Sequence, residues 1–479
     1  MANKKEEKGI TVKKEEDMPE WYSQVCLKSG MADFGPVKGT MIIKPLGYSI
    51  WEKIQENFNR TLKRHNVKNA YFPLFIPESF LKKEAEHAKG FQAEVAWVEK
   101  KEEGERIALR PTSETVMYDA YSKWIKSWRD LPLKINQWCN VVRWEVSDTK
   151  LFLRSREFLW QEGHCVYETE KQCEKEVWNI LDEYEKLCKE LLAIPVLKGK
   201  KTEKETFAGS VYTTTIEAFM PDGKALQCGT SHNLGQNFAK AFNIKYLDKN
   251  EKTQIPFQNS WGFSTRLIGA MVMTHSDDKG LVLPPKIAPT QIVIIPILIK
   301  GKEKGILKKA KELETFLRNS YSVELDERTE YTPGWKFSEY EMKGVPLRIE
   351  IGPNDIKKNQ VVLVRRDNNK KIGVNLESLN KKIKTELDNM QKSIYEKAKH
   401  FLDFSIKKVS EWNEFIKVIK NRQIALSPFC GDVNCEDNIK DKSGGAGSRC
   451  IKEDIKDSKV KCIYCKKPAK YLVYFSKSY

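Results

Sequence analysis

The strongest constraint on the fold is a pair of strand-like runs on either side of a basic loop, within residues 133–164. Strand alternation places these side chains of the first run on one face: Ile135, Gln137, Cys139, Val141, Arg143 and Glu145. In the second run it groups Phe158, Trp160, Glu162 and His164. Charged side chains are costly on an apolar inner face unless they are paired or used. The two runs therefore predict either a hairpin with a buried ion-pair network or the floor of a polar site.

The loop between the runs carries three cations, Lys150, Arg154 and Arg156. A floor of fixed donors and acceptors beneath a mobile cationic loop suits a planar, anionic ligand such as a nucleotide. The hairpin alone is consistent with a structural ion-pair network and with a ligand site. Motifs elsewhere in the chain are needed to distinguish the two.

Length and charge narrow the class of protein. A chain of 479 residues is expected to hold two to four domains. Its formal net charge of +17 favours a polyanionic partner, although lysine enrichment through biased codon usage would give the same value. Residues 1–17 mix lysine and acidic residues without an apolar period, so we expect a disordered leader and no signal peptide. The chain holds no apolar run long enough for a membrane span.

The first half of the chain predicts several elements around the hairpin. A short strand broken at Pro45 leads into a helix at 47–65, which suits an interface or a core. Residues 112–114 (TSE) open a helix that Thr112 or Ser113 can cap, and this motif alone is mostly a capping signal. A longer helix is expected at about 170–193.

Two later segments carry polar residues in strand contexts. In residues 225–232, alternation places Thr230 and His232 on one face and Gln227 on the other. Residues 261–266 (WGFSTR) predict a strand that turns into a helix at a glycine, with Arg266 in the first helical turn. An arginine there can bind phosphate or a base, although such a residue is usually an ordinary surface cation.

Beyond a proline-rich boundary at 284–289, the chain predicts a small α/β layer. Expected helices lie at 303–318 and 334–343, and expected strands at 291–297, 321–326, 347–351 and 361–364. On the strand at 347–351 the apolar residues point inward, so Arg348 and Glu350 are expected to point outward. A long helix at about 376–400 leads to the last unit.

The last unit contains two close cysteine pairs, Cys430 with Cys435 and Cys462 with Cys465. Each pair can supply two thiolates to one tetrahedral zinc ion that joins two turns. Cys450 is a rival ligand, and unligated buried cysteines are the plain alternative. The chain has eleven cysteines, an odd number, and this usage is typical of a reduced, cytoplasmic protein with one metal site.

Taken in order, these motifs resemble one family, the class II aminoacyl-tRNA synthetases, and among them the prolyl-tRNA synthetases of the archaeal/eukaryotic type. The resemblance runs from about Asp17 to Tyr479. Pro45 matches motif 1 of the family, residues 143–145 and 154–158 match motif 2, and residues 262–266 match motif 3. The segments TSE at 112–114, WQEGH at 160–164 and CGTSH at 228–232 are more similar to the prolyl enzymes than to their threonyl, histidyl or glycyl relatives.

The resemblance implies an ATP site, with Arg143 and Arg266 as the catalytic cations. Arg143 would hold the α-phosphate and the amino-acid carboxylate, Glu145 the adenine amino group, and Arg154 the outer phosphates. Phe158 and Arg266 would lie on the two faces of the adenine. The remaining implied ATP contacts are Gln227, Thr230 and Ser264. Because alternation separates Gln227 from Thr230, this assignment requires a bulge or a backbone contact.

The resemblance also implies a proline pocket and a tRNA surface. Thr112 and Glu114 would fix the imino group. The wall around the ring would consist of Trp160, Glu162, His164, Phe207 and His232, with Arg143 at the carboxylate. Arginine and a carboxylate suit the guanines of the proline anticodon, so Glu341 and Arg348 are the anticodon candidates, with an ordinary exposed charge pair as the alternative.

The expected fold is an α+β catalytic domain with an antiparallel sheet at residues 18–283, after the leader at 1–17. An α/β anticodon-binding domain with a linker helix follows at 284–400, and a small zinc-binding α+β domain at 401–479. The implied activity is proline–tRNA ligation in a homodimer, with Mg²⁺ bound to ATP, structural Zn²⁺ and no membrane partner. The rivals are a non-catalytic tRNA-binding relative and a threonyl enzyme, which would be expected to hold zinc in its pocket.

Overall fold

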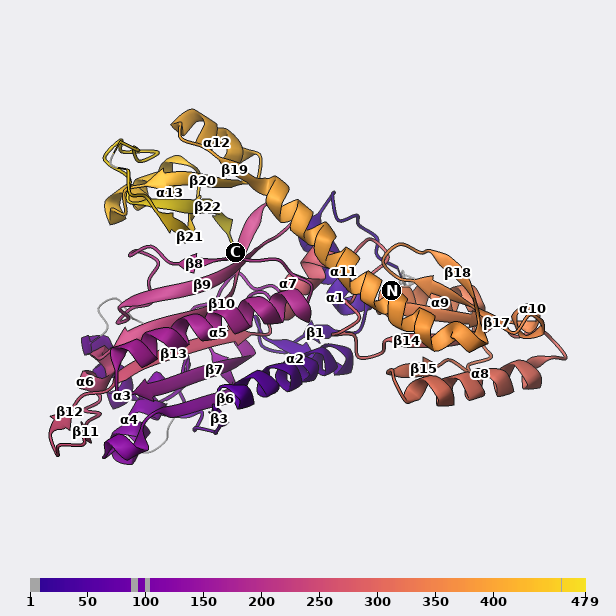
Figure 1. The fold of residues 1–479 in the computed structure, drawn as a ribbon, viewed down its shortest axis with the longest axis horizontal. Helices are drawn as coiled ribbons and strands as arrows, with labels where there is room; N and C mark the ends of the chain where they lie inside the picture. The colour runs from indigo at the N-terminus through magenta and orange to yellow at the C-terminus, as the bar shows by residue number, and fades with distance from the viewer. Residues whose placement is uncertain (1–8, 88–93, 100–103, 458) are drawn as a thin grey trace.

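The computed structural model describes residues 9–87, 94–99, 104–457 and 459–479. Figure 1 shows a large unit around a long sheet, a smaller α/β unit, and a C-terminal unit, with the helix α11 running between the last two. The expected leader falls partly outside the described residues, at 1–8. In its described part, Lys14 donates from Nζ to the carbonyl oxygens of Met273, at 2.7 Å, and Ser276, at 3.0 Å, so this stretch is packed.

The large unit begins with α1 (Met18–Lys28), β1 (Ala32–Phe34), β2 (Met41–Ile43), α2 (Pro45–Arg64), β3 (Lys68–Asn69), β4 (Phe75–Pro77) and α3 (Glu78–His87). It continues with β5 (Ile107–Leu109), α4 (Glu114–Trp124), β6 (Leu133–Val142), β7 (Glu157–Tyr167), α5 (Glu170–Glu190) and β8 (Leu197–Lys200). Its last elements are β9 (Tyr212–Phe219), β10 (Lys224–Gly235), α6 (Asn237–Ala241), β11 (Tyr246–Leu247), β12 (Thr253–Gln254), β13 (Phe257–Ser264) and α7 (Arg266–His275).

The predicted hairpin is confirmed by the antiparallel pairing of β6 with β7. Ile135 lies opposite His164, and Gln137 lies opposite Glu162. Since directly opposite residues share a face, the two groups taken from alternation meet on one side of the sheet. β6 ends at Val142, so Arg143 and Glu145 belong to the loop that follows it.

The central sheet continues into the C-terminal unit. Its strand order is β19-β20-β22-β21-β8-β9-β10-β13-β7-β6-β3. The strands of that unit are β19 (Ile406–Lys408), β20 (Ile424–Phe429), β21 (Gly447–Asp454) and β22 (Tyr471–Ser478), with the helices α12 (Trp412–Lys420) and α13 (Val433–Lys442). The end of β22 also pairs with the start of β10. The C-terminal unit is thus hydrogen-bonded to the sheet that carries the polar hairpin.

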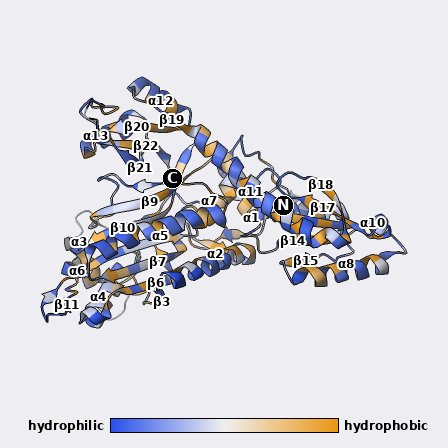
Figure 2. Cartoon of the chain, viewed as in Figure 1, coloured by the Kyte–Doolittle hydropathy of each residue, from blue (hydrophilic) through white to orange (hydrophobic). Residues whose placement is uncertain are grey.

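Helices cover one face of this sheet. α2 buries an apolar stripe that consists of Ile50, Trp51, Ile54, Phe58 and Leu62. Figure 2 shows hydrophilic and hydrophobic residues alternating along the long helices, as expected for helices with one buried face. Among the described residues, no helix combines the length and the apolar character needed to cross a bilayer.

Two expectations about local structure need correction. Ser113 occupies the N-cap position of α4, but its side chain makes no capping hydrogen bond and donates to Glu162, while Thr112 donates its hydroxyl to Glu114. The strand before α7 does not turn at a glycine, because Gly262 lies inside β13, paired with Thr230 and Glu162, and α7 starts only at Arg266.

The α/β unit contains β14 (Ile292–Pro296), α8 (Glu303–Arg318), β15 (Val323–Leu325), α9 (Pro333–Met342), β16 (Leu347–Ile351), α10 (Pro353–Lys357), β17 (Gln360–Arg365), β18 (Lys371–Asn375) and α11 (Leu379–Ser405). β14 is buried and parallel to both β15 and β16, as is typical of a continuous apolar strand in an α/β layer. α10 and β18 were not anticipated. Arg348 and Glu350 alternate with Leu347, Ile349 and Ile351, which share one core, but their expected exposure is wrong, because both are less than a tenth exposed.

Candidate active site

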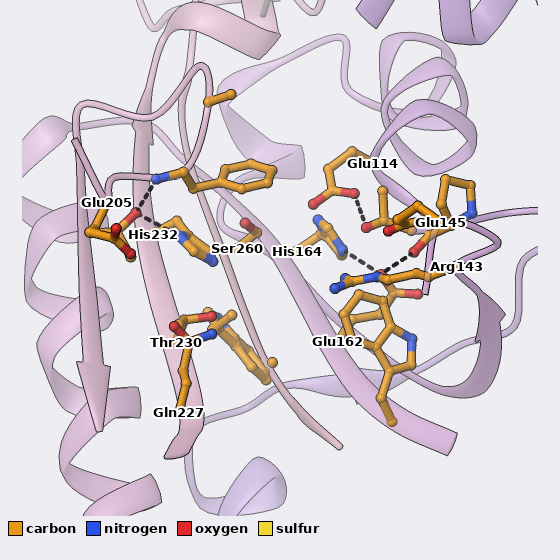
Figure 3. A pocket seen from close by; sticks show the side chains of 18 residues that line it. Glu114, Arg143, Glu145, Glu162, His164, Glu205, Gln227, Thr230, His232 and Ser260 are labelled. Carbon is orange, nitrogen blue, oxygen red and sulfur yellow. Dashed lines mark hydrogen bonds and ion pairs between the residues drawn. The ribbon is translucent and has the colours of Figure 1, made fainter. Parts of the chain in front are cut away.

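The central sheet bears a cavity of about 430 Å³ on its face opposite α5. Figure 3 shows Glu114, Arg143, Glu162 and His164 on one side of it and Gln227, Thr230 and His232 on the other. All residues assigned to the proline pocket line this cavity: Thr112, Glu114, Arg143, Trp160, Glu162, His164, Phe207 and His232. Of the residues assigned to ATP, the cavity is lined by Arg143, Glu145, Gln227 and Thr230.

Glu162 is the centre of the hydrogen-bond network beneath the cavity, and its residue is 1% exposed. Its carboxylate accepts from the backbone N–H of Ser113 at 3.2 Å, from Gln137 Nε2 at 3.1 Å and from His164 Nε2 at 3.1 Å. Cys139 Sγ donates to it at 3.3 Å. Burial raises the pKa of a carboxyl group, but these donors hold the pKa of Glu162 below its ordinary value. The floor therefore carries a fixed negative charge.

The pKa values of the two histidines of the cavity are shifted in opposite directions. Burial lowers the pKa of His164, but the bond to Glu162 and the field of Glu114 outweigh it, so the net shift is upward. His164 Nδ1 faces the hydroxyl of Tyr118 at 3.0 Å. Burial lowers the pKa of His232 to about 3, and its Nδ1 lies 2.9 Å from the hydroxyl oxygen of Thr213. His232 is therefore neutral near pH 7 and offers the ligand a polar but uncharged wall.

The guanidinium groups of Arg143 and Arg266 lie close enough for the charge of one to affect the other. Burial first, and then the charge of Arg143, lowers the pKa of Arg266. Arg266 donates from Nε to the Leu153 carbonyl at 3.0 Å and from Nη1 to the Gln227 carbonyl at 3.3 Å. Two guanidinium groups at one edge of a cavity repel each other, and a bound anion relieves that repulsion. This arrangement suits phosphate.

A β-bulge explains how Gln227 reaches the same cavity as Thr230 and His232. The pairing of β10 with β9 shifts by one residue between Gln227 and Gly229. A bulge changes which face the following side chains point to, so strict alternation fails at this point. The bulge that the ATP assignment required is therefore present.

Four predicted residues lie beside the cavity and not in its lining: Arg154, Phe158, Ser264 and Arg266. The Arg154 side chain is exposed. The backbones of Arg154 and Lys150 form an isolated antiparallel β-bridge across a tight turn of the loop. The Phe158 ring centre lies 5.4 Å from the Arg143 guanidinium. Ser264 Oγ accepts from the backbone N–H of Arg266 at 3.2 Å. The loop and the start of α7 thus form a rim on which a nucleotide can extend.

The sequence did not assign several lining residues to the site: Pro111, Glu205, Ala208, Thr213, Ser260 and Trp261. Gly262, which belongs to the segment matched to motif 3, also lines the cavity. Gly262 is the most informative, because an added Cβ would lie 2.9 Å from the Gln161 carbonyl oxygen. Glycine at this position keeps the sheet surface flat under the cavity. Glu205 and Ala208, by contrast, lie on a loop without any recognisable pattern.

The four paired cysteines come together in the C-terminal unit. The Sγ atoms of Cys430, Cys435, Cys462 and Cys465 all lie within 4.8 Å of one another. Cys435 Sγ is 3.8 Å from Cys462 Sγ, and Cys465 Sγ is 3.5 Å from Cys430 Sγ. Tetrahedral zinc, with Zn–S bonds of about 2.3 Å, separates its sulfur ligands by roughly 3.8 Å. Cys450 is buried in β21 and does not belong to this group.

A second acidic and imidazole group is formed by Glu114, Glu162 and His164, whose ligand atoms also lie within 4.8 Å of one another. His164 already shares a hydrogen bond with Glu162, and Thr112 donates to Glu114. Two carboxylates at the cavity floor suit a cationic amine of a ligand as well as they suit a metal ion.

The anticodon candidates also lie close together in the α/β unit. Arg348 Nη1 is 3.1 Å from Glu341 Oε1, and Arg348 Nη2 is 3.0 Å from Glu350 Oε1. The guanidinium carbon of Arg348 lies 4.0 Å from the ring centre of Phe337. Arg348 is thus enclosed by α9 and by two carboxylates, while the Glu341 side chain remains 19% exposed.

Comparison with known families and proteins covers nearly the whole chain. Residues 96–275 match the tRNA synthetase class II core domain (G, H, P, S and T). Residues 291–386 match an anticodon binding domain, and residues 412–479 match a C-terminal domain of prolyl-tRNA synthetase.

Several curated proteins are similar along their full length. A proline–tRNA ligase of Alkaliphilus oremlandii is 48% identical over 97% of both chains, and one of Ruminiclostridium cellulolyticum is 50% identical over 97% of both. A crystal structure of prolyl-tRNA synthetase from Cryptosporidium parvum, complexed with halofuginone and AMPPNP, is 43% identical with a TM-score of 0.94. The likeness covers 100% of this chain and 99% of that one.

Proposed function

The chain belongs to the prolyl-tRNA synthetases, and from this premise we propose that it activates L-proline with ATP and transfers the prolyl group to the 3′ end of tRNA(Pro). One observation carries the proposal beyond family membership. Every side chain assigned to proline lines one cavity, together with Arg143, Glu145, Gln227 and Thr230 from the ATP assignment. A site of about 430 Å³ with fixed carboxylates at one side and cations at its edge suits proline beside a nucleotide.

The proposed chemistry needs no side-chain nucleophile. The proline carboxylate attacks the α-phosphate of ATP, which gives prolyl-adenylate and pyrophosphate, and the terminal hydroxyl of the tRNA then takes the prolyl group. Arg143 holds the α-phosphate and the carboxylate, and Arg266 stabilises the developing charge from the other side. ATP would bring Mg²⁺, which is usually held by substrate phosphates with one or two carboxylates.

Recognition of proline would depend on the asymmetry of the cavity. Glu114 and Glu162 face the secondary ammonium group of the ligand, while Trp160, Phe207 and His232 bound its ring. The Phe207 and His232 rings lie 4.7 Å apart between centres, so together they form a nearly apolar wall. A neutral His232 does not compete with the ligand for the carboxylates.

The deciding experiment is amino-acid-dependent exchange of labelled pyrophosphate into ATP, with all twenty amino acids and without tRNA. We expect strong exchange with proline, with at most weak exchange with alanine or cysteine. Strong exchange with threonine would keep the fold and overturn the pocket assignment. A folded protein without any exchange would instead favour a non-catalytic tRNA-binding relative.

We further propose that the four cysteines hold one structural Zn²⁺. All four positions would be filled by thiolates, which leaves none open for water, so the ion would stabilise the fold and take no part in catalysis. Metal analysis should find about one zinc per chain, and Cys462→Ser should remove it. Cys450→Ser is the matched control, and loss of zinc from that variant would contradict the assignment.

A homodimer in the cytoplasm completes the proposal. Four apolar side chains around β1, β2 and the start of α2 are more than two-fifths exposed: Phe34, Val37, Ile42 and Tyr48. An exposed apolar group on one surface favours association with a second protein surface. None of the eleven cysteines forms a disulfide, in keeping with a reducing compartment. The archaeal/eukaryotic type and the anticodon role of Glu341 and Arg348 stay predictions.

A further inference from the structure

The junction between the large unit and the α/β unit is built around one arginine, Arg366, which follows β17. Its side chain is only 1% exposed. It donates from Nη1 and Nη2 to the two carboxylate oxygens of Asp277, at 2.8 and 2.6 Å. It also donates from Nε to the carbonyl oxygen of Glu341 at 2.8 Å. One guanidinium thus ties the large unit to the last turn of α9.

Backbone contacts make this junction close. The N–H of Leu281 donates to the carbonyl oxygen of Met342 at 3.0 Å. Gly280 has a φ of +130°, and an added Cβ would lie 2.5 Å from the Cα of Met342. Gly344 faces Leu281 just as closely, at 2.6 Å from its Cβ. A displacement of α9 is therefore transmitted to residues 280 and 281, because the backbones on the two sides of the junction are in direct contact.

The same junction touches the side chain assigned to the anticodon. Glu341 bonds to Arg348 through Oε1 at 3.1 Å, and Lys279 Nζ lies 3.8 Å from its Oε2. Lys279 follows Asp277 by two residues and lies across the boundary from Glu341. A guanine that hydrogen-bonds to Glu341 would compete with Lys279 for the carboxylate.

Helix α7 connects this junction to the active site. Asp277 lies two residues beyond α7, and α7 begins at Arg266. Its residues 267–273 are all buried, so the helix moves as a unit with its surroundings. A helix of this length spans about 15 Å. At its C-terminal end, Lys14 and Asp277 are the fixed points, through the bonds of Lys14 to two carbonyl groups and the bonds of Asp277 to Arg366.

We propose that the Asp277–Arg366 ion pair couples anticodon binding on the α/β unit to the active site, as a positioning contact through which bound tRNA shifts α7 and thereby Arg266. The inference rests on the proposed function, because it needs tRNA(Pro) as the substrate. Neither residue lines the active-site cavity. A shift well below 1 Å in Arg266 is enough to change the rate, since catalysis by positioning is sensitive to such displacements.

The test compares the two half-reactions in Asp277→Asn, a variant that removes the charge and keeps the size of the side chain. We expect proline-dependent pyrophosphate exchange without tRNA to stay within about twofold of the parent protein. Aminoacylation at saturating tRNA(Pro) should lose about tenfold in kcat, which is typical of a coupling between two sites. The KM for tRNA should change little, because the surface that binds the anticodon is intact.

A second measurement separates coupling from support of the fold. In the parent protein, replacement of an anticodon guanine by adenine should raise the KM for tRNA and also lower kcat. In Asp277→Asn the same tRNA should raise KM by the same factor but lower kcat no further. Asp277→Glu, which keeps the charge, should restore at least part of the response of kcat to the anticodon.

Asp367→Asn is the matched control. Asp367 pairs with Arg365 in the same two-pronged geometry, at 2.9 and 2.7 Å, but this pair does not cross the boundary between the units. We expect the Asp367→Asn variant to keep the parent kcat for aminoacylation, and the response of kcat to the anticodon should also be unchanged. If Asp277→Asn fails to fold, Arg366→Lys provides the same comparison, because it keeps the charge and loses the two-pronged geometry.

Three outcomes would overturn the inference. Equal losses in exchange and aminoacylation would make the pair a local support of the active site. An unchanged kcat for aminoacylation would remove the coupling role. An equal response of Asp277→Asn and Asp367→Asn would reduce the pair to a contribution to domain stability. Absence of proline-dependent exchange in the parent protein is a separate result, because it would contradict the proposed function itself.

Discussion

Two sheets of this molecule carry charged side chains at alternating strand positions, yet the charges serve different ends. On β7, Glu162 and His164 face a cavity that a ligand can enter. On β16, Arg348 and Glu350 lie beneath α9, with the Arg348 guanidinium against the ring of Phe337. Strand alternation determines which side chains share a face, but it does not determine what covers that face. A charge that faces a cavity can act on a ligand, whereas a charge beneath a helix mainly stabilises the fold.

The largest expected effect belongs to the cavity side of this comparison. Arg143→Ala removes the cation assigned to both the α-phosphate and the proline carboxylate. We expect proline-dependent pyrophosphate exchange to fall by about 10³-fold, roughly 4 kcal/mol in activation free energy. Thermal unfolding should be nearly unchanged, because this side chain faces the cavity.

A loss of less than about tenfold, roughly 1.4 kcal/mol, would show that Arg143 does not hold the reacting groups. Arg156→Ala is a suitable control on the same loop. Arg156 donates to the Val146 carbonyl at 3.0 Å and does not line the cavity. We expect it to keep most of the exchange activity.

The second prediction tests the covered side. Arg348→Ala leaves the carboxylates of Glu341 and Glu350 without their shared cation in a site where the arginine side chain is 9% exposed. Breaking such a buried pair typically costs about 3 kcal/mol. Hydrogen exchange in the full-length protein should show roughly 10²-fold less protection of the β16 amides. Unchanged protection of these amides would contradict the structural role of Arg348. As an activity control, proline-dependent pyrophosphate exchange without tRNA should persist in this variant.

The third prediction applies the same rule to the opposite face of the catalytic sheet. Glu176 on α5 lies 2.8 Å from Lys134 Nζ on β6 and also faces His65. Burial raises its pKa, but the hydrogen bonds from His65 and Lys134 lower it to about 2. Since this value lies below the ordinary 4.5, the stabilisation is present above pH 4.5 and is lost as the pH falls toward 2.

Glu176→Gln should therefore destabilise the protein at pH 7 by about 2 kcal/mol, after allowance for solvent screening, without a change in the KM for proline. Urea denaturation at several pH values is the measurement. The difference between the parent protein and the variant should shrink between pH 4.5 and 2. A difference that stays constant with pH would show that the charge of the Glu176 carboxylate is not the source of the stabilisation. A change in the KM for proline would show that a charge buried beneath a helix also acts on the ligand.

Most of the cavity lining could be predicted from the sequence because strand alternation and short motifs are local properties. The meeting of Gln137 with Glu162, and of Ile135 with His164, follows from period-two alternation once the two runs are taken as a hairpin. The position of Gln227 could not be derived in this way, because a bulge depends on the register between β9 and β10.

The remaining errors arise from tertiary contacts. Ser113 has a typical capping sequence around it, but the buried carboxylate of Glu162 takes its hydroxyl instead. Arg348 alternates with apolar residues as an exposed residue would, but α9 packs over it. The cysteine pairs were easier to interpret, since each pair is local and only their meeting needed the fold.

The smallest expected effect concerns Glu341, which shares features of the covered charges and of the charges that a ligand can reach. It is partly covered by its bond to Arg348, but its side chain remains 19% exposed and can meet a base. In Glu341→Gln, Arg348 keeps the carboxylate of Glu350 at 3.0 Å, so the loss of stability should be small. The amide offers one acceptor where the carboxylate offers two, so the KM for tRNA(Pro) should rise about tenfold, roughly 1.4 kcal/mol. Glu339→Gln on the same helix is the matched control, since Glu339 pairs with Arg328 and Lys343. An equal rise in that variant would assign the effect to the general field of α9, and only a rise confined to Glu341→Gln would place a guanine at this carboxylate.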